Sequence, residues 1–195
     1  MQRLSAALIL AGAGLLGGCA GAPPAAPAGA EARATPQLRL APSQLGRTLN
    51  LQQHLTLQAP GHDQQLDVLL EADATHVQMG VVAMGQVAAR LSWDGTTLEE
   101  SRAPWWPQAV SGSRILGDLQ LTLWPASAIQ AALPAGWTLA EAGNVRTLRQ
   151  DGEVVAVITR AGTLIELDQR REHFKLRIES RDLGDAPDTR ALTSP

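Results

Sequence analysis

The chain has 195 residues, a net charge of −3 and a single cysteine. One cysteine excludes an internal disulfide framework. The charged residues are scattered along the chain, and no stripe of basic residues is present. Nucleic acid is therefore not an expected partner. The length outside the two ends fits one ordinary folded domain.

The first 18 residues are typical of a secretory signal. A positively charged start is followed by the apolar stretch 4–16 and then by two glycines that precede Cys19. The stretch is shorter than the roughly 20 apolar residues that a transmembrane helix needs. It therefore favours a cleaved signal, with a plain signal peptide and a chance cysteine as the alternative.

The four residues Leu16-Gly17-Gly18-Cys19 resemble the bacterial lipobox. In signals of that kind the cysteine receives a diacylglyceryl group, cleavage occurs before it, and its new amino group is acylated. The resemblance implies lipidated Cys19 and a membrane anchor, which also removes a free thiol from an oxidising compartment. Ala20, not an aspartate, follows, and by resemblance to enterobacterial lipoproteins this favours the periplasmic face of the outer membrane.

Composition divides the rest of the chain into three parts. Residues 19–36 are rich in Ala, Pro and Gly without an apolar period, which predicts a flexible tether after the lipidated cysteine. Residues 37–183 are expected to form one β-rich domain. The polar, turn-rich residues 184–195 predict a loose tail.

Alternating apolar and polar residues predict strands over most of the domain. The dipeptides Asp94-Gly95 and Asp151-Gly152 predict type I′ hairpin turns, because both central residues of that turn need a positive φ. Both faces of the stretch 154–159 are apolar, which is typical of a central strand. Strands are expected at 49–58, 65–72, 76–83, 86–93, from 98, at 145–149, 154–159 and 174–179.

The middle segment, 113–133, predicts two helices. Ser113 is a plausible N-cap for the first, and Pro125 suits the start of the second, 126–133. The first helix is ambiguous, because the leucines of 113–123 also alternate as they would in a strand. The predicted fold is α+β: a strongly curved antiparallel sheet with a helical insertion that covers its inner face.

No residue pattern typical of catalysis or metal binding is present. Ser111-Gly112-Ser113-Arg114 lacks the second glycine of a nucleophile elbow, and the four histidines lack paired ligand spacing. Adjacent Glu99 and Glu100 would face opposite sides of a strand. We therefore expect no enzyme, no metal and no cofactor, and a lipid hydrolase is the least favoured alternative.

Large apolar side chains of the middle region are candidates for a ligand cavity or its lid. Two prolines flank Trp105-Trp106 and exclude a regular helix there. Flexible methionines suit varied apolar ligands but also fill ordinary cores, and core packing is the alternative for the tryptophans too. The candidates are Met79, Met84, Trp93, Trp105, Trp106, Ile115, Leu116, Leu119, Leu123 and Trp124.

The lipobox, "VVAMGQVAARLSWDG", "PWWP", "ILGDLQLTLWP", "GWTL" and "LRQDGEVVAVI" together resemble the bacterial lipoprotein family of domain of unknown function 3261. The resemblance covers about residues 43–183, and "DLQLTLWP" with the downstream "GW" is its most specific part. Members are often encoded beside aryl-polyene lipid biosynthesis and large exporters. The resemblance implies a fold similar to the outer-membrane lipoprotein carrier and receptor (LolA/LolB-like), an open half-barrel closed by helices around an apolar cavity. It carries over no catalytic residue.

The expected function is a monomeric, non-enzymatic outer-membrane lipoprotein that binds a lipid-like or acylated ligand in cell-envelope export, with the segment 115–124 as a lid. The alternative is a structural or assembly accessory of an envelope export machine, with a filled core and a protein partner. A cavity of about 300–1,000 Å³ beneath the helices is the feature that separates the two.

Overall fold

The structure is a computed structural model that describes residues 35–184 except residue 109. The expected signal, Cys19, the stretch up to residue 34 and the tail from residue 185 lie outside the described residues. Thr35, within the predicted tether, is buried, and its hydroxyl donates to Glu172 Oε1 at 2.8 Å. The folded part therefore includes the last residues of that segment.

Ten strands form one antiparallel sheet in the order β5-β4-β3-β2-β1-β10-β9-β8-β7-β6. The two outermost strands, β5 and β6, are not neighbours, so the sheet is open. This confirms the predicted open antiparallel sheet. The strands are β1 (Leu49–Ala59), β2 (His62–Ala72), β3 (Val77–Ala83), β4 (Gln86–Trp93), β5 (Leu98–Arg102), β6 (Trp137–Ala142), β7 (Val145–Gln150), β8 (Glu153–Ala161), β9 (Leu164–Gln169) and β10 (Phe174–Asp182).

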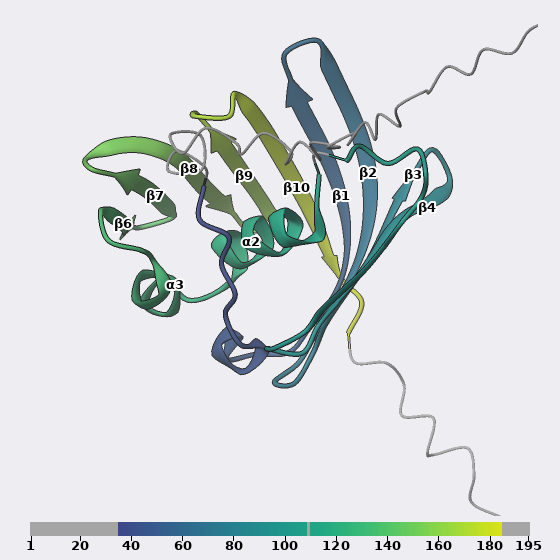
Figure 1. The fold of residues 1–195 in the computed structure, drawn as a ribbon, viewed down its shortest axis with the longest axis horizontal. Helices are drawn as coiled ribbons and strands as arrows, with labels where there is room; N and C mark the ends of the chain where they lie inside the picture. Colours follow the sequence, from purple (N-terminus) through teal and green to yellow (C-terminus); the bar gives the residue numbers. More distant parts are fainter. Residues whose placement is uncertain (1–34, 109, 185–195) are drawn as a thin grey trace, which may run out of the picture. The chain divides into compact units, whose positions relative to one another are not determined.

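The first and last strands pair in the middle of the sheet. Their register runs from Leu51 opposite Asp182 to Gln58 opposite Lys175. This pairing joins the meander β1–β5 to the meander β6–β10, which Figure 1 shows on the two sides of the β1/β10 seam.

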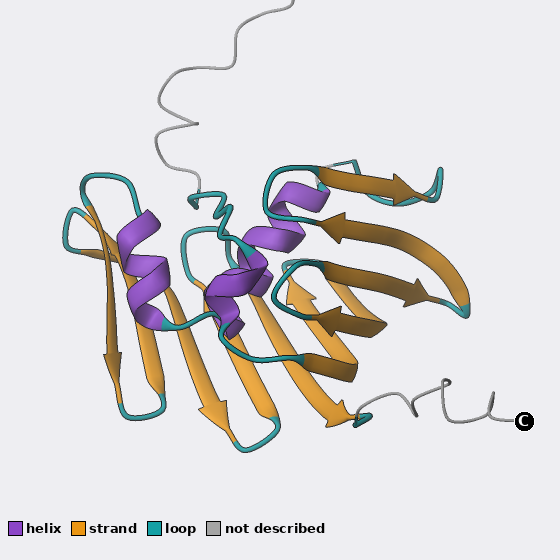
Figure 2. Cartoon of the chain, turned by 90° about the horizontal axis from the view of Figure 1, so that it is seen from below, coloured by secondary structure: helices purple, strands orange, loops and turns teal. Residues whose placement is uncertain are grey.

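Two helices follow β5 in the chain, α2 (Gly112–Leu123) and α3 (Ala126–Ala132). Both lie on the same side of the sheet, which curves around them in Figure 2. The predicted helical insertion is confirmed, and the ambiguous segment is a helix. A short 3-10 turn, η1 (Pro42–Leu45), precedes β1.

The N-cap of α2 differs from the prediction. The cap is Ser111, whose side chain accepts a hydrogen bond from the Arg114 backbone N–H at 3.3 Å. Ser113 lies inside the first turn instead, and its hydroxyl accepts from Arg39 at 2.8 Å. The sequence offers two serines two positions apart, and the fold uses the earlier one.

One of the two predicted type I′ turns is wrong. Asp151 and Gly152 both have positive φ, 50° and 86°, as the turn requires. In the other turn only Gly95 has a positive φ. The Asp94 carboxylate accepts hydrogen bonds from the backbone N–H groups of Thr96 and Thr97, both at 2.7 Å, and this local bonding selects a different turn.

The core lies between the inner face of the sheet, the two helices and the segment 35–45, named here the N-terminal strap. The buried side chain of Gln120 in α2 holds this strap in place: its Nε2 donates to the Leu40 carbonyl and its Oε1 accepts from the Leu40 N–H, both at 2.9 Å. The strap and the sheet thus enclose α2 from two sides. The largest fully buried apolar side chains are Trp124, Leu70, Leu116, Ile129, Leu148, Ile158 and Leu167.

Candidate functional site

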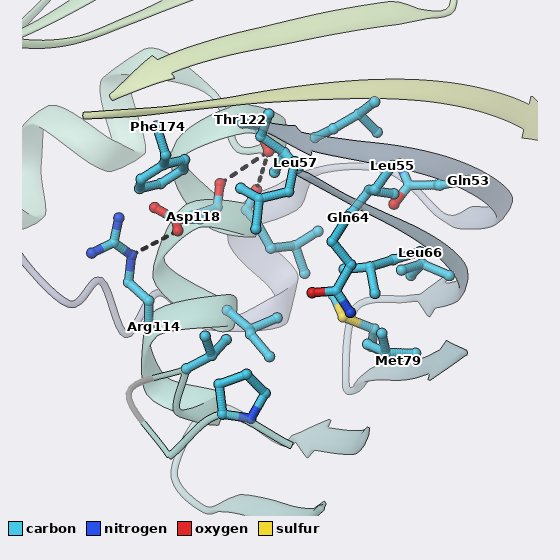
Figure 3. A pocket seen from close by; sticks show the side chains of 18 of the residues that line it. Gln53, Leu55, Leu57, Gln64, Leu66, Met79, Arg114, Asp118, Thr122 and Phe174 are labelled. Carbon is cyan, nitrogen blue, oxygen red and sulfur yellow. Dashed lines mark hydrogen bonds and ion pairs between the residues drawn. The ribbon is translucent and has the colours of Figure 1, made fainter. Parts of the chain in front are cut away.

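A cavity of about 380 Å³ lies between α2 and the inner face of β1, β2, β3 and β10 (Figure 3). Aliphatic side chains of the strands form one wall, and one face of α2, from Arg114 to Leu123, forms the other together with the preceding loop. The lining residues are Gln53, Leu55, Leu57, Ala59, Gln64, Leu66, Val68, Met79, Val81, Trp106, Pro107, Val110, Arg114, Ile115, Asp118, Leu119, Thr122, Leu123, Glu172, Phe174, Leu176 and Ile178.

The cavity exists because the sheet face is only partly covered. Leu55, Leu57, Leu66 and Leu176 all line it, and each is only half-buried although it lies on the inner face. Packed protein interiors rarely leave such space beside aliphatic side chains. Apolar surface that an occupant could bury is therefore present in the described part of the chain.

Trp106 fixes the loop that covers one end of the cavity. Its ring is buried, and its Nε1 donates to the Val110 carbonyl at 2.9 Å. The adjacent Trp105 is 40% exposed. The two neighbours thus have opposite environments, although they lie in a turn, which the Trp106 N–H closes on the Ala103 carbonyl at 2.9 Å, and not in the extended backbone expected between two prolines.

A charged cluster interrupts the apolar lining at α2. Arg114 Nε donates to Asp118 Oδ2 at 2.7 Å, and its Nη1 donates to Glu172 Oε2 in the turn before β10. The guanidinium group also lies 5.4 Å from the centre of the Phe174 ring. Figure 3 shows Arg114 beside Asp118 and near Phe174 at the edge of the cavity.

Burial dominates the electrostatics of this cluster. It raises the pKa of the Asp118 carboxyl, because the opposing charge and hydrogen bond of Arg114 do not fully offset the loss of solvent and Glu172 adds repulsion. Burial also acts against the Arg114 charge, but Asp118 and Glu172 outweigh it and raise the pKa of Arg114. The arginine therefore stays positively charged, whereas the carboxyl of Asp118 takes up a proton at a higher pH than an ordinary aspartate does.

The predicted cavity and lid residues fall into three groups. Met79, Trp106, Ile115, Leu119 and Leu123 line the cavity. Trp93, Leu116 and Trp124 do not line it, because they are fully packed: Trp93 and Trp124 donate from Nε1 to the strap carbonyls of Leu40 and Ala41. The last two predicted residues, Met84 and Trp105, are exposed on the surface.

Sequence reasoning missed the polar part of the site. The four-residue spacing of Arg114 and Asp118 is a helical ion-pair signal that was available. Nothing in the local sequence marks Glu172 and Phe174, which the β1–β10 pairing brings to the cavity. Their position at the cavity depends on the pairing of strands that lie far apart in the sequence.

Histidine and carboxylate side chains are the other groups that could carry chemistry among the described residues. No three His, Cys, Asp or Glu side chains there lie together in a way that could hold a metal ion. His54 contacts Asp67 at 3.0 Å between β1 and β2, with both side chains exposed. No helix within this part of the chain is long and apolar enough to cross a bilayer.

An open antiparallel sheet with an apolar cavity beneath one helix defines this chain as a cavity-bearing β-sheet protein of α+β class. The chain belongs to the family described as "Protein of unknown function (DUF3261)", whose model matches residues 50–182. The match covers all ten strands in part or whole and both helices. Comparison with curated proteins gives no match.

Proposed function

We propose that the protein is a lipid-anchored outer-membrane lipoprotein that binds a lipid-like or acylated ligand non-covalently in the cavity beneath α2. The cavity carries the proposal: it has a volume of about 380 Å³ and a predominantly aliphatic lining, within the range of ligand sites. A ligand that covers the half-buried leucines is stabilised by about 25 cal/mol for each Å² of apolar surface removed from water.

The carrier-like half-barrel is part of the same proposal. An open sheet around helices supports a likeness to the outer-membrane lipoprotein carrier and receptor, and α2 then acts as the lid. Lipids of the envelope, including those of aryl-polyene type, match an apolar, non-directional site. The cavity favours this function over that of an assembly accessory with a filled core.

The proposal is tested by closing the cavity from one strand. Leu66 in β2 lines the cavity, whereas Leu69 in the same strand is 55% exposed on the opposite face. We expect Leu66→Trp to abolish the lipid that co-purifies with the full chain from membranes, and Leu69→Trp to retain it. Native mass spectrometry and lipid extraction measure both. Wild-type protein without any bound lipid, and without affinity for an acyl probe, would contradict the proposal.

The anchor is tested separately at Cys19. We expect Cys19→Ala to lose incorporation of an alkyne-labelled palmitate and to leave the membrane fraction, since the thioether-linked lipid needs the thiol and two or more acyl chains are needed for stable attachment. Labelling that persists in Cys19→Ala would place the lipid elsewhere. The folded domain serves as the internal control, because its thermal unfolding should not change.

A further inference from the structure

One nitrogen of the charged cluster has no partner. Nη2 of Arg114 is shielded from solvent and makes no hydrogen bond, while Nε and Nη1 of the same group bind Asp118 and Glu172. A buried donor left unpaired destabilises the folded state, and more so when it carries charge. Arg114 and Phe174, whose ring lies over the guanidinium group, both line the cavity. The unpaired donor therefore belongs to a side chain that borders the space an occupant would fill.

The charges of the cluster limit which acceptor fits. Asp118 and Glu172 together carry more negative charge than Arg114 neutralises. A free carboxylate would add a third anion next to Asp118, the less exposed of the two carboxylates, where solvent screens the repulsion less than at the surface. A neutral carbonyl oxygen accepts the hydrogen bond without that repulsion.

We infer that Arg114 Nη2 binds the ester or amide carbonyl of an acyl ligand whose hydrocarbon chain occupies the aliphatic part of the cavity. The inference rests on the proposed function and specifies its ligand: a neutral acyl ester or amide, not a free fatty acid. The guanidinium group fixes the head of the ligand, and Leu55, Leu57 and Leu66 contact its chain.

Three ligands of matched length test this assignment: methyl dodecanoate, dodecanoate and tridecane. Each competes with the methyl ester of dansyl-undecanoic acid, a neutral dansyl probe, for the full chain in one fixed concentration of a mild detergent, near pH 7. Arg114→Met/Asp118→Leu removes the donor together with its buried partner, and the Glu172 carboxylate that remains keeps the hydrogen bond from the Thr35 hydroxyl at 2.8 Å. Arg177→Met is the control, because Arg177 lies on the exposed face of β10 and pairs with Glu166 and Glu179.

We expect wild-type protein to bind the ester about tenfold or more tightly than either the acid or the hydrocarbon. The double variant should lose the preference for the ester over the hydrocarbon, and Arg177→Met should keep it. Equal or tighter binding of the acid, or an unchanged preference in the double variant, would overturn the inference and leave acyl binding intact. Failure of the wild type to bind the dansyl probe or any of the three ligands would instead overturn the proposed function.

Discussion

Asp73 shows how one side chain organises a turn of this sheet. Between β2 and β3 its Oδ1 accepts hydrogen bonds from the Thr75 hydroxyl at 2.7 Å and from the backbone N–H groups of Thr75 and His76 at 2.6 and 2.8 Å. The hydroxyl bond and then the two backbone bonds lower the pKa of Asp73 to about 2. Since this value lies below the usual 3.8, the ionised carboxylate stabilises the folded state above about pH 4. That contribution is lost as the pH falls towards 2.

We predict that Asp73→Ala lowers the free energy of unfolding by about 1 kcal/mol near pH 7, a value kept small because the turn is exposed to solvent. The difference from the wild type should be mostly lost near pH 2, where the carboxyl is protonated in the unfolded state and about half protonated in the folded state. Urea unfolding at the two pH values measures it. Thr75→Val should lose part of the same stability, and a difference independent of pH would contradict the assignment.

At the scale of elements, α2 depends on its cap and on its neighbours. Ser111 caps the helix, and Ser113 bonds a side chain outside it. We predict that Ser111→Ala lowers the free energy of unfolding by about 1 kcal/mol, whereas Ser113→Ala stays within about 0.5 kcal/mol of the wild type. Chemical denaturation of the two variants compares them directly. A larger loss for Ser113→Ala would show that the helix begins later than Gly112.

The alternation of side chains was enough to predict strands such as β3, in which every second residue is buried, whereas β8 was predicted from its two apolar faces. It could not decide between helix and strand for α2, since Leu119, Leu121 and Leu123 fit both periods. The tertiary contacts favour the helix, because Gln120 binds both the N–H and the carbonyl of Leu40. A polar residue at this position gave no sign in the sequence that its side chain is buried. The short strand β9 was not predicted, although Ile165 and Leu167 alternate with Glu166 and Asp168 as a strand requires.

The cavity is formed by several elements together, and no single helix or strand contains it. Pairing of β1 with β10 sets Leu57 opposite Leu176, and the register of two strands at opposite ends of a domain cannot be deduced from periodicity. Predicted lining residues on α2 and β3 were accessible to sequence reasoning because they are large and apolar. The distance between α2 and the sheet decides whether they enclose space, and long-range contacts of α2 determine it.

Those contacts hold the two ends of α2 unequally. At the C-terminal end, Arg146 of β7 donates from Nη1 to the carbonyls of Leu121 and Trp124 at 3.1 and 2.7 Å, and Arg160 of β8 donates to the Thr122 carbonyl. Cations at this end also complement the helix dipole. At the other end, the long-range side-chain bonds, from Arg39 to Ser113 and from Arg114 to Glu172, are exposed to solvent, whereas those of Arg146 are buried. If α2 is the lid of the proposed carrier, its N-terminal half is therefore the part that moves.

We predict that backbone amides of residues 112–119 exchange with deuterium faster than those of residues 120–124, because local opening follows the number of contacts that must break. An acyl ligand should slow exchange in the first group and leave the second nearly unchanged, since bound ligand stabilises the closed arrangement by mass action. Hydrogen-exchange mass spectrometry of the full chain with and without ligand measures both. Leu66→Trp provides the control, because a filled cavity should slow the first group without any ligand. Equal protection along α2, or a ligand effect confined to residues 120–124, would mean that the helix does not open from its N-terminal end.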